Sequence, residues 1–281
     1  MELFLHVAED ALLDTLKMLP FLFGTYLLME YLEHRASRQM ERLLAGSHRL
    51  GPVVGAALGL VPQCGFSVVA ANLYSGGLIT MGTLIAVFIA TSDEAIPVLL
   101  SQPGSWGLIG RLLAVKLVLG VLAGFLVDLL FRRAPAQASG EEHGHAGHEH
   151  CEEGILRPAL GHTVQIFFFV LLANLLLGGA VELLGQERLG VLLLGNSIFQ
   201  PVVAALVGLI PNCAASVLLT SLYLEGTLSF GALVAGLSTG AGVGLMVLLR
   251  TNHKPKENLT VVGLLAAIGA VAGMAVQLVA G

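Results

Sequence analysis

Residues 52–84 read PVVGAALGLVPQCGFSVVAANLYSGGLITMGTL, and residues 201–233 read PVVAALVGLIPNCAASVLLTSLYLEGTLSFGAL. Placing Cys64 on Cys213 gives the offset 213 − 64 = 149, and the shared residues then align without a gap. Each copy is an apolar run that proline, an amide residue and cysteine interrupt near its middle. Inside a membrane, such an interruption is tolerated only where it faces protein or a wet cavity. We therefore place the centre of function at these two turns.

Composition predicts a polytopic membrane protein. Of the 281 residues, 56% are hydrophobic and 12% are charged, whereas about 25% are charged in an ordinary soluble domain. Acidic residues near the start and a long first apolar run indicate that no signal peptide is removed. Three cysteines give no disulfide framework, and we expect no nucleic-acid partner because the chain has no basic face.

Hydrophobic runs long enough to enter the bilayer define an all-α fold. We expect a first membrane repeat at residues 1–131, a linker at 132–157 and a second membrane repeat at 158–281. The expected spans or hairpins are residues 11–31, 51–74, 77–100, 107–131, 161–184, 200–224, 227–249 and 259–279, with a short amphipathic piece at 189–199.

The distribution of basic links predicts the topology. Links at residues 35–49, 132–157 and 250–256 carry the Lys and Arg excess that marks cytoplasmic loops. Three runs lie between the first two links, so one run must enter and leave the membrane by the same face. We assign this role to the interrupted core at 51–74, whose halves are each about half a bilayer long. Two inverted repeats of three spans and one re-entrant hairpin follow, with both termini outside; eight true spans in parallel halves are the alternative.

Polar side chains at the interruptions are the candidate substrate ligands. An unwound turn offers free carbonyls and N–H groups, so it can hold a cation or an anion. Acids inside a membrane are costly and therefore suspected of function, and thiols suit a soft metal or metalloid whereas carbonyls with carboxylates suit manganese. Buried cysteine also serves as a small apolar filler, which is the alternative for both thiols. The candidate residues are Gln63, Cys64, Ser67, Asn72, Asp93, Glu94, Asn212, Cys213 and Ser216.

The linker at 132–157 contains a dense group of histidine, glutamate and cysteine residues. Imidazole and thiolate bind zinc, nickel, copper and, less tightly, manganese. We interpret the group as an accessory metal-capturing or sensing loop in the cytoplasm, with a solvated low-complexity linker as the alternative. Its candidate ligands are His143, His145, His148, His150 and Cys151.

The turns VPQCGFSV and IPNCAASV, the segment ATSDEA and the histidine-rich loop together resemble the ten-segment heavy-metal exporters of bacteria, described as arsenic efflux or manganese transporter proteins. The turns are also distantly similar to those of the organoarsenical-efflux permeases, which are richer in cysteine. The resemblance covers nearly the whole chain. It implies metal export across the bacterial inner membrane, and six spans with four half-helices would account for ten segments.

We therefore expect a secondary transporter for a divalent heavy metal or metalloid, and not an enzyme. Besides the lipid bilayer and the transported metal, its partners would be a coupling ion, proton or sodium, and a second copy of the chain in a homo-oligomer; no tightly bound cofactor is expected. A permease for an organic or oxo-anion is the alternative, since it would use the same hairpins with helix N-termini as its anion site.

Overall fold

A computed structural model describes residues 50–61, 64–91, 95–102, 104–131, 197–210 and 213–280, and single positions at 23, 27, 44, 160, 161, 164, 167, 168, 171 and 172. Of Cys64 and Cys213 it describes the backbone only. All regular elements within these ranges are α-helices. The linker at 132–157 and most of the expected spans at 11–31 and 161–184 lie outside the described residues.

Within the described residues, ten helices form two matching series. Four helices of the first series start 149 residues before their counterparts, as 51 + 149 = 200, 64 + 149 = 213, 81 + 149 = 230 and 106 + 149 = 255. The duplication seen in the sequence therefore recurs as a duplication of helices. The first series is α2 Gly51–Gly59, α3 Cys64–Ser75, α4 Met81–Ala90, α5 Ala95–Leu100 and α6 Trp106–Leu130; the second is α9 Gln200–Gly208, α10 Cys213–Leu224, α11 Phe230–Thr239, α12 Gly242–Thr251 and α13 Pro255–Ala280.

In the part of the chain that the structure describes, four helical stretches are long and apolar enough to cross a membrane. They are Met81–Leu100, Trp106–Leu130, Phe230–Thr251 and Pro255–Val279. Each coincides with an expected run, and two of them contain an interruption, between α4 and α5 and between α11 and α12. The cores expected at 51–74 and 200–224 are each divided into two shorter helices, as the Pro-amide-Cys turns predict.

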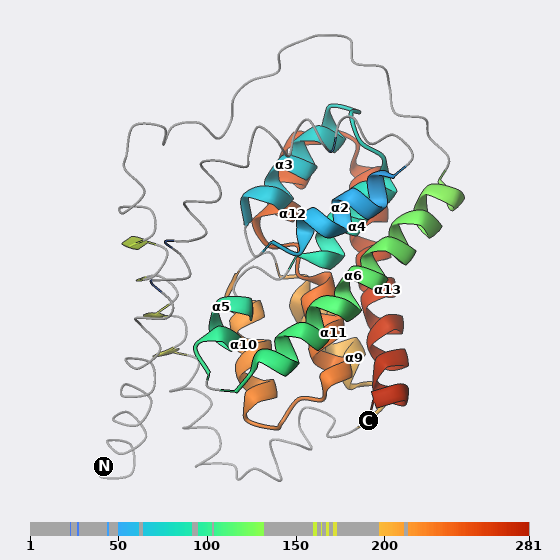
Figure 1. Cartoon of the computed structure of the whole chain (residues 1–281). Helices are drawn as coiled ribbons and strands as arrows, with labels where there is room; N and C mark the ends of the chain where they lie inside the picture. The colour runs from blue at the N-terminus through green and yellow to red at the C-terminus, as the bar shows by residue number, and fades with distance from the viewer. Residues whose placement is uncertain are drawn as a thin grey trace, which may run out of the picture.

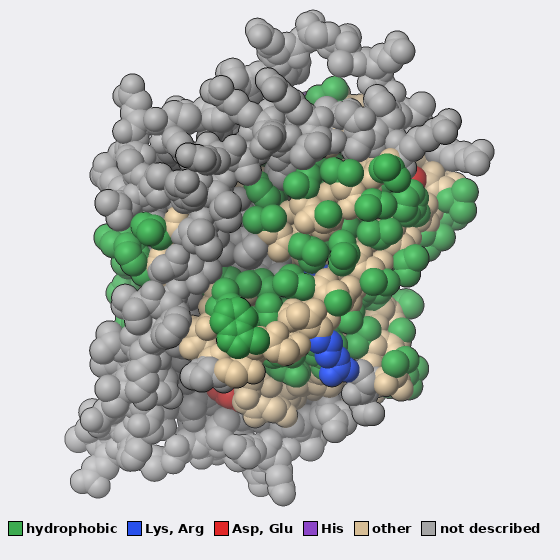
Figure 2. All heavy atoms as spheres, viewed as in Figure 1, with side chains coloured by type: hydrophobic (Ala, Val, Ile, Leu, Met, Phe, Trp, Pro, Cys, Tyr) green, Lys and Arg blue, Asp and Glu red, His purple; other side chains and the backbone are tan. Residues whose placement is uncertain are grey.

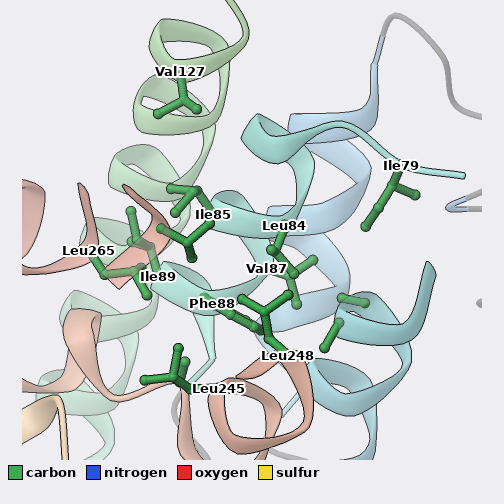
Figure 3. Close-up of a cluster of buried hydrophobic side chains, with 14 of the residues drawn as sticks. Ile79, Leu84, Ile85, Val87, Phe88, Ile89, Val127, Leu245, Leu248 and Leu265 are labelled. Carbon is green, nitrogen blue, oxygen red and sulfur yellow. The ribbon is translucent and has the colours of Figure 1, made fainter. Parts of the chain in front are cut away.

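Buried side chains of α4 form the middle of a hydrophobic cluster (Figure 3). All residues from Gly82 to Ala90 are buried, and Phe88 and Ile89 are fully enclosed. Leu245 and Leu248 from α12 and Leu265 from α13 pack into the same cluster. The hydrophobic core therefore joins the two halves, so neither half is an independent unit.

The outer surface of α6 is apolar. Its exposed side chains include Leu122, Leu126, Leu129 and Leu130, each more than half exposed. On the described part of the face seen in Figure 2, hydrophobic side chains are widespread and charged side chains form only small spots. In water such a surface would cost free energy, whereas lipid accepts it. The surface supports a membrane location for the chain.

Figure 1 shows how the helices of the two series are arranged. In that view α2, α3 and α4 lie in the upper part with α12, and α9, α10 and α11 lie in the lower part with α5. Helix α6 ascends to the upper right, whereas its counterpart α13 descends to the C-terminus. Across the halves, α3 packs against α12 and α10 packs against α5.

Glycines allow the half-length helices to approach their neighbours. A Cβ atom built on Gly59 of α2 would lie 2.7 Å from the carbonyl oxygen of Val87 in α4. On α9 the equivalent Gly208 packs against Gly236 and Thr239 of α11, where a Cβ would again overlap. The spacing of Gly51, Gly55 and Gly59 predicts this close helix packing, and all three face α4.

Candidate substrate site between the interrupted helices

The interruption between α2 and α3 and the interruption between α9 and α10 each end just before a cysteine. Cys64 is the first residue of α3 and Cys213 is the first residue of α10. A helix N-terminus has N–H groups without intrahelical partners, so both positions can hold a polar group. The side chains of the two cysteines, and residues Gln63 and Asn212 before them, lie outside what the structure describes, so their roles stay predictions.

The two candidate serines lie near the interruption between α11 and α12. Ser67 of α3 is fully buried and packs against Gly244 of α12, where a built Cβ would lie 2.6 Å from the serine Cβ. Ser216 is half-buried, and its Oγ lies 3.8 Å from the position of a Cβ built on Gly240, which follows α11. Ser67 therefore lies beside α12 of the other half, and Ser216 lies near the turn that follows α11 in its own half.

Asn72 stands apart from these serines. It lies five residues after Ser67 on α3, a rise of about 7 Å, and its residue is exposed whereas Ser67 is fully buried. Its carbonyl oxygen accepts a hydrogen bond from the N–H of Gly76 at the end of the helix. The structure thus does not bring Asn72 together with Ser67.

The interruptions between α4 and α5 and between α11 and α12 leave backbone carbonyls without intrahelical hydrogen bonds. Helix α4 ends at Ala90, and Thr91 after it is extended. Helix α11 ends at Thr239, and the N–H of Ala241 turns to the carbonyl of Thr239. The carbonyl of Leu237 is consequently left without its usual i+4 donor. Asp93 and Glu94, both predicted site residues, follow Thr91 outside the described part of the chain.

A buried lysine links these two helix ends. Lys116 of α6 has 0% of its surface exposed. Its ammonium group donates hydrogen bonds to the carbonyl of Thr91 and, at 2.7 Å, to the carbonyl of Leu237. The C-terminal end of a helix carries partial negative charge, so a cation is stabilised there. The side chain of Lys116 therefore connects interruptions that come from different halves of the chain.

Sequence reasoning missed Lys116, although the signal was present. It is a single lysine within the apolar run Trp106–Leu130, and a charge inside a membrane segment is suspected of function for the same reason as Asp93 and Glu94. Its importance follows from the fold, because no spacing in the sequence relates position 116 to Leu237.

Two hydroxyl groups lie at the C-terminal end of α11. Thr239 donates to the carbonyl of Ala205 on α9 at 2.8 Å, which fastens α9 to α11. The hydroxyl of Ser238 is buried and has no hydrogen-bond partner within the described residues. A buried polar group without a partner costs free energy, so such a group suggests a ligand or a functional role.

The described atoms of this region that could bind a metal ion are mainly backbone carbonyl and hydroxyl oxygens. Among the described residues, no group of three or more histidine, cysteine, aspartate or glutamate side chains could hold a metal ion. The predicted loop ligands, His143, His145, His148, His150 and Cys151, lie outside these residues. Carbonyl and hydroxyl oxygens suit hard cations, so this part of the site can coordinate a cation without thiolates.

The helices and their apolar surface define an all-α, multi-pass membrane protein. The model of the family described as "Putative, 10TM heavy-metal exporter" matches residues 1–186 and 164–281, and the chain belongs to that family. No curated protein and no solved structure matches the chain.

Proposed function

We propose that this protein is a secondary transporter that exports a heavy metal or metalloid through a site between the four helix interruptions. The observation that carries the proposal is that interruptions at equivalent positions of the two halves are joined at Lys116. Free backbone groups at interrupted helices bind the substrates and ions of many transporters. The family match supplies the substrate class.

An inverted repeat is the architecture that we propose for this transporter. The opposite course of α6 and α13 in Figure 1 supports it, as does the placement of α2 and α3 at one end and α9 and α10 at the other. In this arrangement α2–α3 and α9–α10 are re-entrant hairpins. Alternating access would follow when one half moves against the other around the central site.

The substrate ligands that we propose come from the hairpin turns and the hydroxyls near them. Gln63, Cys64, Asn212 and Cys213 supply amide oxygens and thiols, and Ser67 and Ser216 lie one turn further along α3 and α10. Ser238 adds a buried hydroxyl without a described partner. Asp93 and Glu94 supply negative charge beside Thr91. Manganese would use the oxygens, whereas a soft metal or an arsenic species would use the thiols.

We further propose that the linker at 132–157 captures metal ions on the cytoplasmic side of the inner membrane. Deleting residues 141–153 should weaken metal tolerance of cells at low metal load but leave transport by purified protein intact, because the loop is an accessory. Metal-tolerance growth assays and vesicle transport measure the two effects. Equal loss in both assays would place the loop within the transport site.

Transport by purified protein in proteoliposomes tests the main proposal. The panel contains manganese(II), zinc(II), arsenite and small organic and oxo-anions, with protein-free liposomes as the control. Movement of a metal or of arsenite above the control supports the proposal. Movement of an anion alone contradicts it and favours an anion permease, for which the buried ammonium of Lys116 would be an attractive centre.

A further inference from the structure

We propose that the link between α12 and α13 is a docking surface for the headgroups of anionic phospholipids. The surface consists of three exposed cations, Arg250, Lys254 and Lys256. Its occupant is a lipid of the surrounding bilayer whose headgroup carries a net negative charge, as that of phosphatidylglycerol does. The inference does not depend on which substrate the protein transports.

The link carries an excess of positive charge. Residues 250–257 contain three cations and one acid, Glu257, so the net charge is 3 − 1 = +2 with histidine counted as neutral. The carboxylate of Glu257 accepts a hydrogen bond from the hydroxyl of Tyr74 at 3.4 Å and lies 3.7 Å from the ammonium of Lys254. Lysine and arginine beside the end of a membrane helix attract anionic headgroups. The surface is therefore complementary in charge to an anionic lipid.

Exposed apolar side chains next to the cations indicate their depth in the membrane. Leu249, which precedes Arg250, is 49% exposed, and Leu259 near the start of α13 is 74% exposed. Such leucines are most stable among lipid acyl chains. Lys256 lies three residues before Leu259, a rise of about 4.5 Å on a helix. The cations thus lie at the level where acyl chains end and headgroup phosphates begin.

Buried polar side chains hold the turn that presents the cations. Asn252 and Asn258 are both buried. The side-chain amide of Asn252 donates to the amide oxygen of Asn258 at 2.7 Å, and the amide of Asn258 donates to the carbonyl of Asn252 at 2.9 Å. These two hydrogen bonds fasten the end of α12 to the start of α13. A fixed turn loses little conformational entropy when a ligand binds, which favours binding.

The equivalent link in the first half shows that the fold does not require these cations. Helices α5 and α6 are joined there, and none of residues 101–107 is charged. The residues that stand 149 positions before the three cations are Ser101, Ser105 and Gly107. Positive charge on one of two equivalent links is expected if only that link meets anionic headgroups.

The basic link also contacts the other half of the molecule. The hydroxyl of Thr251 lies 2.9 Å from the hydroxyl of Ser75 on α3, and Tyr74 of the same helix bonds to Glu257. Both contacts join α3 of the first half to the link of the second. A lipid that holds the link in place also stabilises this contact, so lipid binding should raise the stability of the whole fold.

Thermal unfolding of the purified protein in micelles of a neutral detergent tests the inference. Phosphatidylglycerol, phosphatidylcholine with the same acyl chains, or inorganic phosphate is added in increasing amounts, and the unfolding midpoint is measured. We expect phosphatidylglycerol to raise the midpoint more than phosphatidylcholine does. High salt should reduce this difference, because salt screens exposed charges.

Neutral variants locate the effect on the surface. Each lysine or arginine near an anionic membrane surface contributes about five-fold to affinity. Lys256→Gln should therefore raise the half-saturating amount of phosphatidylglycerol about five-fold, and Arg250→Gln, Lys254→Gln and Lys256→Gln combined should raise it about 100-fold. The charge-conserving combination of Arg250→Lys, Lys254→Arg and Lys256→Arg should keep the wild-type value.

Arg111→Gln is the matched control, because it removes an exposed cation from α6 of the first half. It should leave the response to phosphatidylglycerol unchanged. If it weakens the response as much as Lys256→Gln does, the effect belongs to total charge and the inference is wrong. Equal midpoint shifts with the two lipids at low salt, or an unchanged response in the neutral variants, would also overturn it. A shift with inorganic phosphate as large as that with phosphatidylglycerol would assign the surface to a free anion, which contradicts a lipid site.

Discussion

The glycine at position 244 leaves room for Ser67, and this contact joins α12 of the second half to α3 of the first. Lys116 also joins the two halves, because its side chain reaches the ends of α4 and α11. In both cases a single side chain near an interruption contacts the other half. Individual residues near the interruptions therefore contribute contacts between the two halves.

Substitution of the two thiols and of the two amides in the turns tests whether the proposed site binds a soft or a hard substrate. If a soft metal binds through thiolates, Cys64→Ser and Cys213→Ser should each reduce transport, and the double variant should be little worse than the poorer single one, since members of one site are not additive. If oxygens bind the substrate, the loss should appear in Gln63→Ala and Asn212→Ala. Initial rates of transport in proteoliposomes distinguish binding through thiolates from binding through oxygens. Wild-type rates for all four variants, singly and together, would place the site elsewhere.

At the scale of elements, packing of half-length helices requires glycine at their contacts. Gly208→Ala should destabilise the protein by about 1–3 kcal/mol, the usual cost of overpacking, because the new Cβ would overlap backbone of α11 at Gly236. Gly263→Ala is the control, since this glycine lies on α13 with nothing within 4 Å of a built Cβ. Thermal unfolding in detergent measures both. Equal midpoints for the two variants would contradict this account of the α9–α11 contact.

The start of α4 depends on a side chain from α6. Asp128 accepts hydrogen bonds at 2.8 Å from the hydroxyl of Thr80 and from the N–H of Gly82. Asp128→Ala should lower stability by about 2 kcal/mol, because hydrogen bonds to a charged acceptor and a helix cap are lost together. Asp128→Asn should cost less, since its amide oxygen can still accept one bond. Denaturation midpoints in detergent test this order, and equal losses would show that the charge itself matters.

At the scale of the whole molecule, the proposed inverted repeat predicts on which side of the membrane each link lies. Single cysteines introduced at positions 34 and 140 should be labelled from the cytoplasm, and cysteines at positions 2 and 281 from outside, because the proposed arrangement keeps the basic links in the cytoplasm. Labelling with a membrane-impermeant reagent in intact cells and in everted vesicles measures the sides. Positions 2 and 140 on one side would contradict the arrangement.

The sequence by itself determined the duplication, the division of each core into two helices and the positions of the long apolar helices. These features follow from local chemistry: proline interrupts a helix, and a long apolar run requires lipid. The glycine spacing also predicted close packing on α2. Such signals lie within one element, so they can be read before the chain is folded.

Only the tertiary structure decided what meets at the centre. It placed Ser67 beside Gly244, separated the exposed Asn72 from the buried Ser67, and brought Lys116 to carbonyls of Thr91 and Leu237. Backbone carbonyls leave no trace in the amino-acid sequence, because every residue has one. Whether a carbonyl is free depends on where its helix ends, and which side chain reaches it depends on how the halves pack.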